Sequence, residues 1–371
     1  MKSYSRRNFL KTSVMGGVAA TCIRPSAIFA SFGKQDKFSA RVSLTTGDNR
    51  ADITFRALQP FSKEIAQAIG RRRVVLKPNN VQINVPLTAT HVDTLEGILE
   101  FLKSIGKLEN VIIAESAAGG PTLDGFRNYG YYSLVSKYPV KLVDLDTEPF
   151  DLLYVFDEKD FRPHPVRYSH IILDPDSFVV SVARLKTHDR VVATLSLKNI
   201  VVGAPIKDTG FTWTSSKKPG SKSDKPLIHG SGFRGINYNL YALSRQVHPH
   251  LAVIDGFEGM EGNGPNSGTP VDHRICLAGL DWLAADRVGV ELMGIDFAKI
   301  GYLNFCAQTG AGVADLNKIE IVGESLSRHK RIYKLNDNLN EQLIWMNPVS
   351  QNHLYSQNLK SFSSTLGNRM Q

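Results

Sequence analysis

Short apolar runs alternate with segments of helical periodicity through most of this chain. The runs at 73–77 and 111–114 are rich in Val and Ile and lack strict polar alternation, which is typical of strands buried on both faces. Between them, residues 91–105 carry apolar residues at a helical spacing and end at Gly106. This alternation predicts an α/β fold with a mostly parallel sheet covered by helices.

The same patterns predict the remaining elements and the domain organisation. Further strands are predicted at 41–46, 141–146, 168–173, 178–185, 251–255 and 318–323, and further helices at 51–69, 122–138, 233–247 and 282–293. We predict one α/β domain over 38–330, with two lobes at 38–175 and 176–330 around a cleft. One extended sheet is the alternative. Polar composition predicts a long surface loop at 205–232 and a polar C-terminal tail at 331–371 that packs on the surface or frays.

The first 30 residues predict an export signal of the twin-arginine (Tat) type. They contain the sequence Ser5-Arg6-Arg7-Asn8-Phe9-Leu10-Lys11, a weakly apolar run and small residues ending at Ala30. The run is too short for a stable membrane span, which needs about 20 apolar residues. We therefore expect the Tat machinery as a partner and a periplasmic or other extracytoplasmic location. A basic disordered arm, an uncleaved anchor and lipidation at Cys22 are alternatives that the sequence favours less.

Charge and cysteine content exclude several classes of function. The whole chain has a net charge of +9, but the signal holds five of its 44 basic residues and no acidic one. The remainder has 39 basic and 35 acidic residues, which is not the dense positive charge of a nucleic-acid-binding protein. Cys276 and Cys306 form no C-x-x-C pair, so a cysteine-ligated iron–sulfur cluster is not expected. Two separate buried thiols are favoured over a disulfide.

Polar residues follow several predicted strands, where open parallel sheets bind ligands. An ammonium group is costly to bury alone, so Lys77, Lys186 and Lys198 need acidic partners or an anionic ligand. A histidine titrates near neutral pH, which makes His188 a candidate acid–base group. We predict catalytic roles for His188, Lys186 and Glu115. The predicted substrate-binding residues are Lys77, Asn79, Thr90, His91, Lys198, Asn199, Asp255, Glu258 and Asn263.

Several of these residues also have ordinary structural explanations. Lys77 could reach solvent at a strand tip, and His91 could be a helix-cap neighbour. The glycine-rich stretch 256–265 could be a plain loop, because it lacks the phosphate-loop and dinucleotide patterns. No G-x-S-x-G or H-E-x-x-H motif supports a serine hydrolase or a zinc peptidase. A metal of unknown identity held by His91, His188, His229 and Glu115 remains an alternative.

Six motifs in this order resemble the domain-of-unknown-function family 362 (DUF362) over roughly residues 40 to 325. They are Lys77-Pro78-Asn79, Thr90-His91, Leu185-Lys186-Thr187-His188 and the segments 194–199, 259–265 and 292–296. Some family members also carry a ferredoxin-like cluster module, whose cysteines are absent from this sequence. The resemblance implies a fold and a site location rather than a reaction. Two hypotheses follow: an exported enzyme acting on an anionic small molecule, or a non-catalytic extracytoplasmic protein that binds a ligand or metal.

Overall fold

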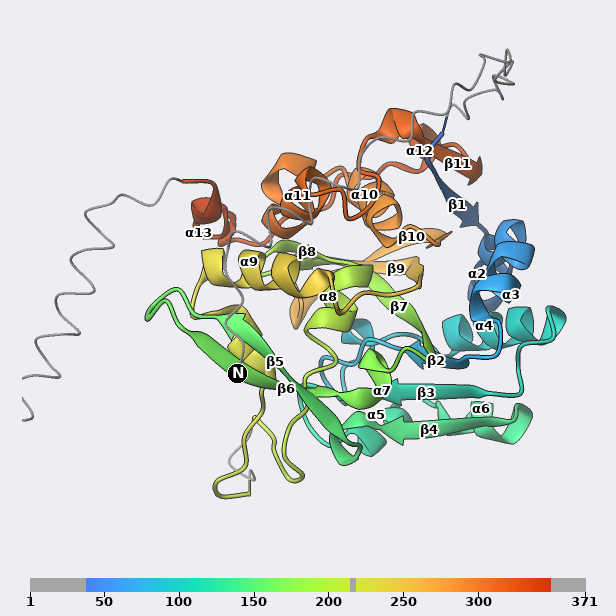
Figure 1. The fold of residues 1–371 in the computed structure, drawn as a ribbon. Coiled ribbons are helices and arrows are strands. Elements are labelled where there is room, and N and C mark those ends of the chain that lie inside the picture. The colour runs from blue at the N-terminus through green and yellow to red at the C-terminus, as the bar shows by residue number, and fades with distance from the viewer. Residues whose placement is uncertain (1–37, 214–217, 348–371) are drawn as a thin grey trace, which may run out of the picture. The chain divides into compact units, whose positions relative to one another are not determined.

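A nine-stranded mixed sheet forms the centre of the part of the chain that the structure describes (Figure 1). The structure is a computed structural model that describes residues 38–213 and 218–347. The predicted export signal therefore lies outside the described residues. In spatial order the strands are β11 (Ile319–Gly323), β1 (Ala40–Thr46), β10 (Ser267–Gly279), β9 (Leu251–Asn263), β7 (Ser177–His188), β2 (Arg73–Lys77), β3 (Val111–Glu115) and β4 (Val140–Asp144), with β8 (Val192–Thr194) beside β7.

Most strand pairs in this sheet are parallel. β11 runs parallel to β1, and the neighbours from β9 through β7, β2 and β3 to β4 are parallel. β10 is antiparallel to both β1 and β9, and β8 is antiparallel to β7. The predicted α/β class with a mostly parallel sheet is confirmed.

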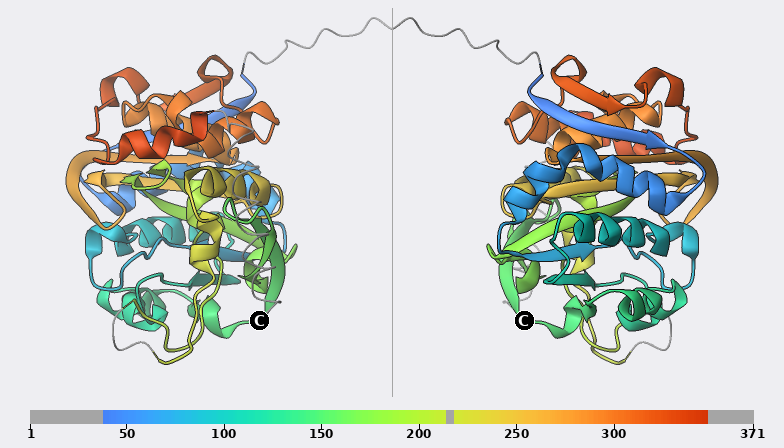
Figure 2. Two further views of the ribbon diagram at one scale, coloured as in Figure 1. Left: turned by 90° about the vertical axis from the view of Figure 1, so that its left-hand side faces the viewer. Right: turned by 90° about the vertical axis from the view of Figure 1, so that its right-hand side faces the viewer.

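Helices cover both faces of the sheet (Figure 2). Successive strand residues point to opposite faces, so Val74 and Leu76 of β2 pack with α2 to α6, whereas Val75 packs with α8 to α11. The helices are α2 (Arg50–Leu58), α3 (Ser62–Ile69), α4 (Val92–Ser104), α5 (Thr122–Asn128), α6 (Tyr132–Lys137), α7 (His170–Leu173), α8 (Ser196–Val201), α9 (Phe233–Ser244), α10 (Trp282–Leu292), α11 (Gly301–Gln308), α12 (Leu326–His329) and α13 (Leu339–Gln342).

Shorter elements complete the fold. β5 (Phe150–Phe156) and β6 (Pro163–Ser169) form a separate antiparallel hairpin. The 3-10 helices are η1 (Gln59–Phe61), η2 (Pro86–Thr88), η3 (Leu145–Thr147), η4 (Lys225–His229), η5 (Phe297–Lys299), η6 (Leu316–Lys318) and η7 (Leu343–Met346). Of these, η4 matters most for function, because it contributes side chains to the site described below.

Two predicted helices are each divided in the structure. Pro60 has no backbone N–H to continue a helix, and the predicted helix 51–69 becomes α2, η1 and α3. Gly130 has a φ of +75°, whereas residues of a right-handed helix have negative φ values. It therefore separates α5 from α6. Both breaks lie on the face of the sheet opposite α8 to α11, and neither alters the sheet order.

Two predictions and one alternative for the middle of the chain differ from the structure. The predicted strand 168–173 is the end of β6 followed by α7, because a short apolar run does not distinguish strand from helix. The glycine-rich stretch 256–265, for which a plain loop was one alternative, belongs largely to β9, which pairs with β10 as far as Asn263. Its glycines allow close packing: a Cβ on Gly259 would lie 2.2 Å from the Tyr333 hydroxyl oxygen. The region 205–232, predicted as a surface loop, contains η4 and the buried Lys225.

The two predicted lobes are not confirmed. β2 from the first predicted lobe pairs with β7 from the second, and β1 pairs with β10, so strands of both contribute to one sheet. Part of the predicted tail packs against this domain, because Tyr333 and Gln342 are buried and Gln342 accepts a hydrogen bond from the Val192 backbone N–H. Residues 348–371 lie outside the described residues.

The two cysteines of the described part are both buried free thiols, as predicted. Cys276 lies in β10 and Cys306 in α11. No helix within 38–213 and 218–347 has the length and apolar character needed to span a bilayer.

Candidate functional site

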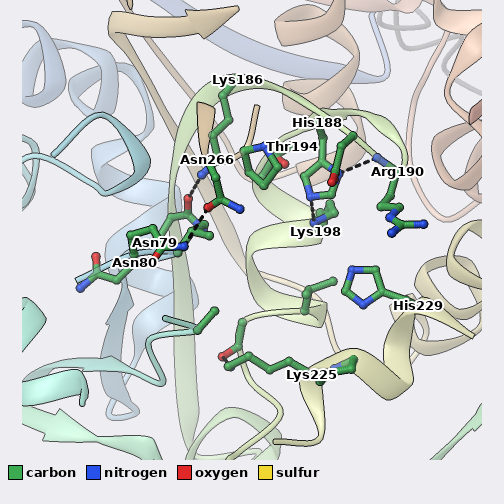
Figure 3. Close-up of a pocket in the computed structure, with 18 of the residues that line it drawn as sticks. Asn79, Asn80, Lys186, His188, Arg190, Thr194, Lys198, Lys225, His229 and Asn266 are labelled. Atoms are coloured by element: carbon green, nitrogen blue, oxygen red, sulfur yellow. Dashed lines mark hydrogen bonds and ion pairs between the residues drawn. The ribbon is translucent and has the colours of Figure 1, made fainter. Parts of the chain in front are cut away.

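A cavity of about 600 Å³ lies at the carboxyl ends of β2, β3 and β7 and is bordered by α8 and η4. This is the edge at which parallel sheets bind ligands. In the view of Figure 3, Lys186, His188 and Lys198 lie above Lys225 and His229. The polar and charged side chains lining the cavity include Lys77, Asn79, Asn80, Gln82, Glu115, Lys186, His188, Asp189, Arg190, Thr194, Lys198, Lys225, His229 and Asn266.

A buried ion pair joins the ends of β2 and β3. Lys77 Nζ lies 2.7 Å from Glu115 Oε1, and both side chains are almost fully buried. Burial lowers the pKa of the Lys77 ammonium, and the Glu115 charge opposes this shift. Glu115 also accepts hydrogen bonds from the backbone N–H groups of Asn80 and Ser116. Glu115 therefore fixes the cavity wall, and its two oxygens are already engaged.

The loop after α8 approaches this ion pair closely. A Cβ on Gly203 would lie 2.3 Å from Lys77 Nζ and 2.3 Å from the Asn199 carbonyl oxygen. Only glycine allows the backbone to pass there without displacing the Lys77 amine.

Lys186 is fully buried at the cavity without a carboxylate partner. Its Nζ donates to Asn79 Oδ1 and to the Thr88 carbonyl oxygen, the latter at 3.2 Å. Among the described residues, no carboxylate lies within ion-pair distance of this amine. Burial, followed by the charge of Lys198, holds the pKa of Lys186 well below its usual value. An anion entering the cavity would supply the negative charge that Lys186 lacks.

His188 and Lys198 form a hydrogen-bonded pair. In the tautomer that carries the ring proton on Nε2, His188 Nδ1 accepts a hydrogen bond from the Arg190 backbone N–H at 3.0 Å. Nε2 lies 2.9 Å from Lys198 Nζ. In this tautomer the Nε2–H group donates to a neutral Lys198 amine, whereas a Lys198 ammonium donates to Nε2 of the Nδ1–H tautomer.

The pKa values of this pair leave Lys198 mostly protonated and the His188 ring neutral at neutral pH. Burial lowers the pKa of Lys198 to about 8. Burial and the charge of Lys198 hold the pKa of His188 well below its usual range. Asp189 Oδ1 lies 3.1 Å from His188 Nδ1. The ring can therefore change to the Nδ1–H tautomer facing Asp189 when Lys198 takes up a proton.

The η4 segment closes the cavity with two more basic groups. Lys225 is buried, and its Nζ donates to the Gly203 and Pro205 carbonyl oxygens, each at 2.7 Å. Burial lowers the pKa of Lys225 to about 7 and that of His229 to about 4. The cavity thus holds more basic groups than its two lining carboxylates, Glu115 and Asp189, can neutralise.

The structure brings together six of the residues predicted from the sequence. Lys77, Asn79, Glu115, Lys186, His188 and Lys198 line the cavity. Two others support it from behind. The Thr90 hydroxyl accepts a hydrogen bond from the Asn79 backbone N–H, and the Asn199 side chain contacts both Lys77 and Asn79.

Four predicted substrate-binding residues lie elsewhere. His91 caps the N-terminus of α4 beside Asp93. Asp255 is buried against Thr94 and Arg50, Glu258 pairs with Arg184, and Asn263 binds Asp337 on the surface. None of these four side chains lines the cavity, and the partners named here also lie outside its lining. His91 does not line the cavity, and the described residues contain no group of three or more side chains that could hold a metal, so the four residues of the alternative metal site are not brought together.

Several cavity residues are not among those predicted from the sequence. Asn80 and Asn266 directly follow predicted motifs and Arg190 lies two residues after one, so they could have been included on that ground. Lys225 was missed because its region reads as a Lys-rich surface loop. The one available signal was the apolar pair Leu227-Ile228 next to it, which suggests local burial.

Comparison with known families agrees with this picture. The family described as "Domain of unknown function (DUF362)" matches residues 74–291, from β2 to α10, which includes every lysine of the cavity. This chain belongs to the DUF362 family. The family description names no activity, so the function of this DUF362 domain has to be argued from the cavity.

Two individual proteins are similar to the DUF362 chain. The thylakoid-associated protein sll1697 of Synechocystis is 24% identical over 230 residues, which cover 62% of this chain and 65% of that protein. The chain thus matches just under two thirds of that relative, whose name gives a location and no reaction. A crystal structure of a Thermotoga maritima protein shares 12% identity over 61% of this chain and 55% of the other, with a TM-score of 0.36. This distant likeness adds nothing to the fold described above.

Proposed function

We propose that this DUF362 domain is an enzyme that acts on an anionic small molecule in the cavity. One observation carries the proposal: Lys186, Lys198 and Lys225 are buried around one cavity, and none has a carboxylate within ion-pair distance among the described residues. A carboxylate or phosphate would accept charge-assisted hydrogen bonds from these amines. It would also supply the negative charge that stabilises the protonated forms of Lys186 and Lys198.

The His188–Lys198 pair is suited to proton transfer. Both groups line the cavity and contact each other directly. The pKa of Lys198, lowered to about 8 by burial, lies close to neutral pH, where a general acid or base works best. Lys198 would exchange the proton with the substrate, and His188 would orient its amine. In this proposal Glu115 positions Lys77 and Asn80 and does not react.

The first test is anion binding, measured by calorimetry with phosphate, oxalate and citrate. We expect wild-type protein to bind at least one of them, and Lys186→Gln to bind it at least about tenfold more weakly, because a hydrogen bond to a charged group contributes roughly 1.5–3 kcal/mol. Lys137→Gln is the matched control, because this lysine is exposed and pairs with Glu96 far from the cavity. Equal affinity of wild type and Lys186→Gln would contradict the proposal.

Turnover separates an enzyme from the alternative, a non-catalytic extracytoplasmic binding protein that would use the same cavity. Compounds that bind are incubated with the protein and followed by NMR. We expect a chemical change that is lost in Lys198→Met. Stoichiometric retention without any change would favour the binding protein.

We further propose that residues 1–30 direct export through the Tat machinery to the periplasm or another extracytoplasmic site. The support is the Arg6-Arg7 pair in its motif, followed by a short apolar run and small residues. In fractionated bacteria, wild-type protein is expected outside the cytoplasm. The charge-preserving variant Arg6→Lys/Arg7→Lys is expected to remain inside. Export of that variant at the wild-type level would exclude a twin-arginine signal.

A further inference from the structure

Lys225 differs from the other cavity lysines in its partners. Lys77 pairs with Glu115, Lys186 binds the Asn79 amide oxygen, and Lys198 contacts His188. Within the described part of the chain, Lys225 Nζ donates hydrogen bonds to two backbone carbonyl oxygens, those of Gly203 and Pro205, each at 2.7 Å. Among the described residues, no carboxylate lies within ion-pair distance of its Nζ.

These two carbonyls fix the orientation of the Lys225 amine. A neutral amine has two N–H bonds, one bond to carbon and one lone pair in a tetrahedral arrangement. Here both N–H bonds are directed at backbone oxygens, and the side chain is only 4% exposed. Lys225 also lines the cavity, so the third tetrahedral position of its nitrogen, which holds the lone pair when the amine is neutral, has no protein partner among the described residues and is open to a ligand.

We propose that Lys225 forms a Schiff base with a small aldehyde or ketone that carries a carboxylate or phosphate. This inference rests on the proposed function, because Lys186 and Lys198 would bind the anionic group. It extends that function by naming the reactive group of the substrate, a carbonyl carbon, and the nucleophile that attacks it.

The reaction balances without a further reagent. The Lys225 lone pair forms a bond to the carbonyl carbon, and the electron pair of the C=O π bond moves to oxygen, which takes up a proton as nitrogen releases one. The resulting carbinolamine loses its hydroxyl group with a second proton as water, and the nitrogen lone pair forms the C=N bond. The products are one imine and one water. The Lys198–His188 pair lines the same cavity and can carry the protons.

The ionisation of Lys225 supports this geometry. Burial lowers the pKa of its ammonium to about 7. About half of the amine is therefore unprotonated at neutral pH, whereas an ordinary lysine with a pKa of about 10.4 is almost entirely protonated.

The test is reductive trapping on the purified protein. Pyruvate or glyoxylate is added with cyanoborohydride at neutral pH, and the protein is analysed by intact mass and peptide mapping. We expect one reduced adduct per chain, on Lys225. Trapping should increase as the pH rises through about 7, because the neutral amine is the reactive form. Lys225→Arg should reduce the trapped fraction at least about tenfold, and Lys137→Arg should leave it unchanged.

The outcomes distinguish this inference from the proposed function. An adduct on Lys186 or Lys198, or adducts spread over surface lysines, would overturn the assignment of Lys225. Absence of any adduct, with phosphate or oxalate still bound, would overturn the Schiff base and leave the anion site intact. Absence of both anion binding and trapping would overturn both. If Lys225→Arg fails to fold, peptide mapping of the wild-type protein still identifies the lysine that carries the adduct.

Discussion

Glu115→Gln is expected to lower the free energy of unfolding by about 3–5 kcal/mol, the usual cost of removing one partner from a buried ion pair. Lys77 is fully buried and has Glu115 as its carboxylate partner at 2.7 Å. Glutamine keeps the shape of glutamate but has one acceptor oxygen instead of two. It would therefore leave the Lys77 charge uncompensated and oppose its own amide donors to backbone N–H groups that Glu115 now satisfies. Urea unfolding at neutral pH measures the loss.

Two further variants make this result specific to the buried pair. Asp124→Asn removes a carboxylate that pairs with Arg127 at 2.8 Å on the surface, and it should cost less than about 1 kcal/mol. Lys77→Met/Glu115→Gln removes the stranded charge, so its loss should be smaller than the sum of the single-variant losses. A loss below about 1 kcal/mol for Glu115→Gln would show that Lys77 does not depend on this partner.

The core of the fold could be predicted from the sequence because strands buried on both faces are continuous runs of apolar residues. β2, β3 and β7 appear as apolar runs whose residues must face helices on both sides. The exposed hairpin strand β5 could not be found in this way, since Phe150, Leu152 and Tyr154 face solvent and its pattern is not that of a core strand. The glycine-rich part of β9 was not predicted as a strand because glycine is rare in strands. There it allows the close approach of Tyr333.

The candidate site was predictable where a residue directly ends a buried strand. Lys77, Glu115 and Lys186 are such residues, and parallel pairing places their strand ends at one edge. Asp255 shows the limit of this rule: it also follows a buried strand, yet its side chain turns to Thr94 and Arg50 on α4 and α2. The alternation of side chains along a strand predicts the face on which each one lies only while the strand is regular. The pairing of β7 with β9 contains a register shift, and beyond such a bulge the sequence alone does not give the direction of a side chain.

Asp286→Ala is the second change expected to have a large effect, because this buried carboxylate holds α8 in place. Asp286 lies in α10 and is fully buried. Its Oδ1 accepts from the Ser196 N–H at 2.8 Å and from the Ser196 hydroxyl at 2.6 Å, and its Oδ2 accepts from the Leu197 N–H at 3.1 Å. Burial raises the pKa of Asp286 to about 7, and these three donors offset part of that shift.

Removing the carboxylate leaves two backbone N–H groups and one hydroxyl buried without their acceptor. We expect a loss of about 2–4 kcal/mol in urea unfolding, together with weaker anion binding, because α8 carries Lys198 and Asn199. Asp296→Ala is the matched control: it removes an exposed cap that accepts a single N–H, from Ala298, and should cost about 1 kcal/mol with unchanged anion binding. The idea would be contradicted if Asp286→Ala lost no more free energy of unfolding than Asp296→Ala and bound anions with wild-type affinity. In that case apolar contacts alone would hold α8 and position Lys198.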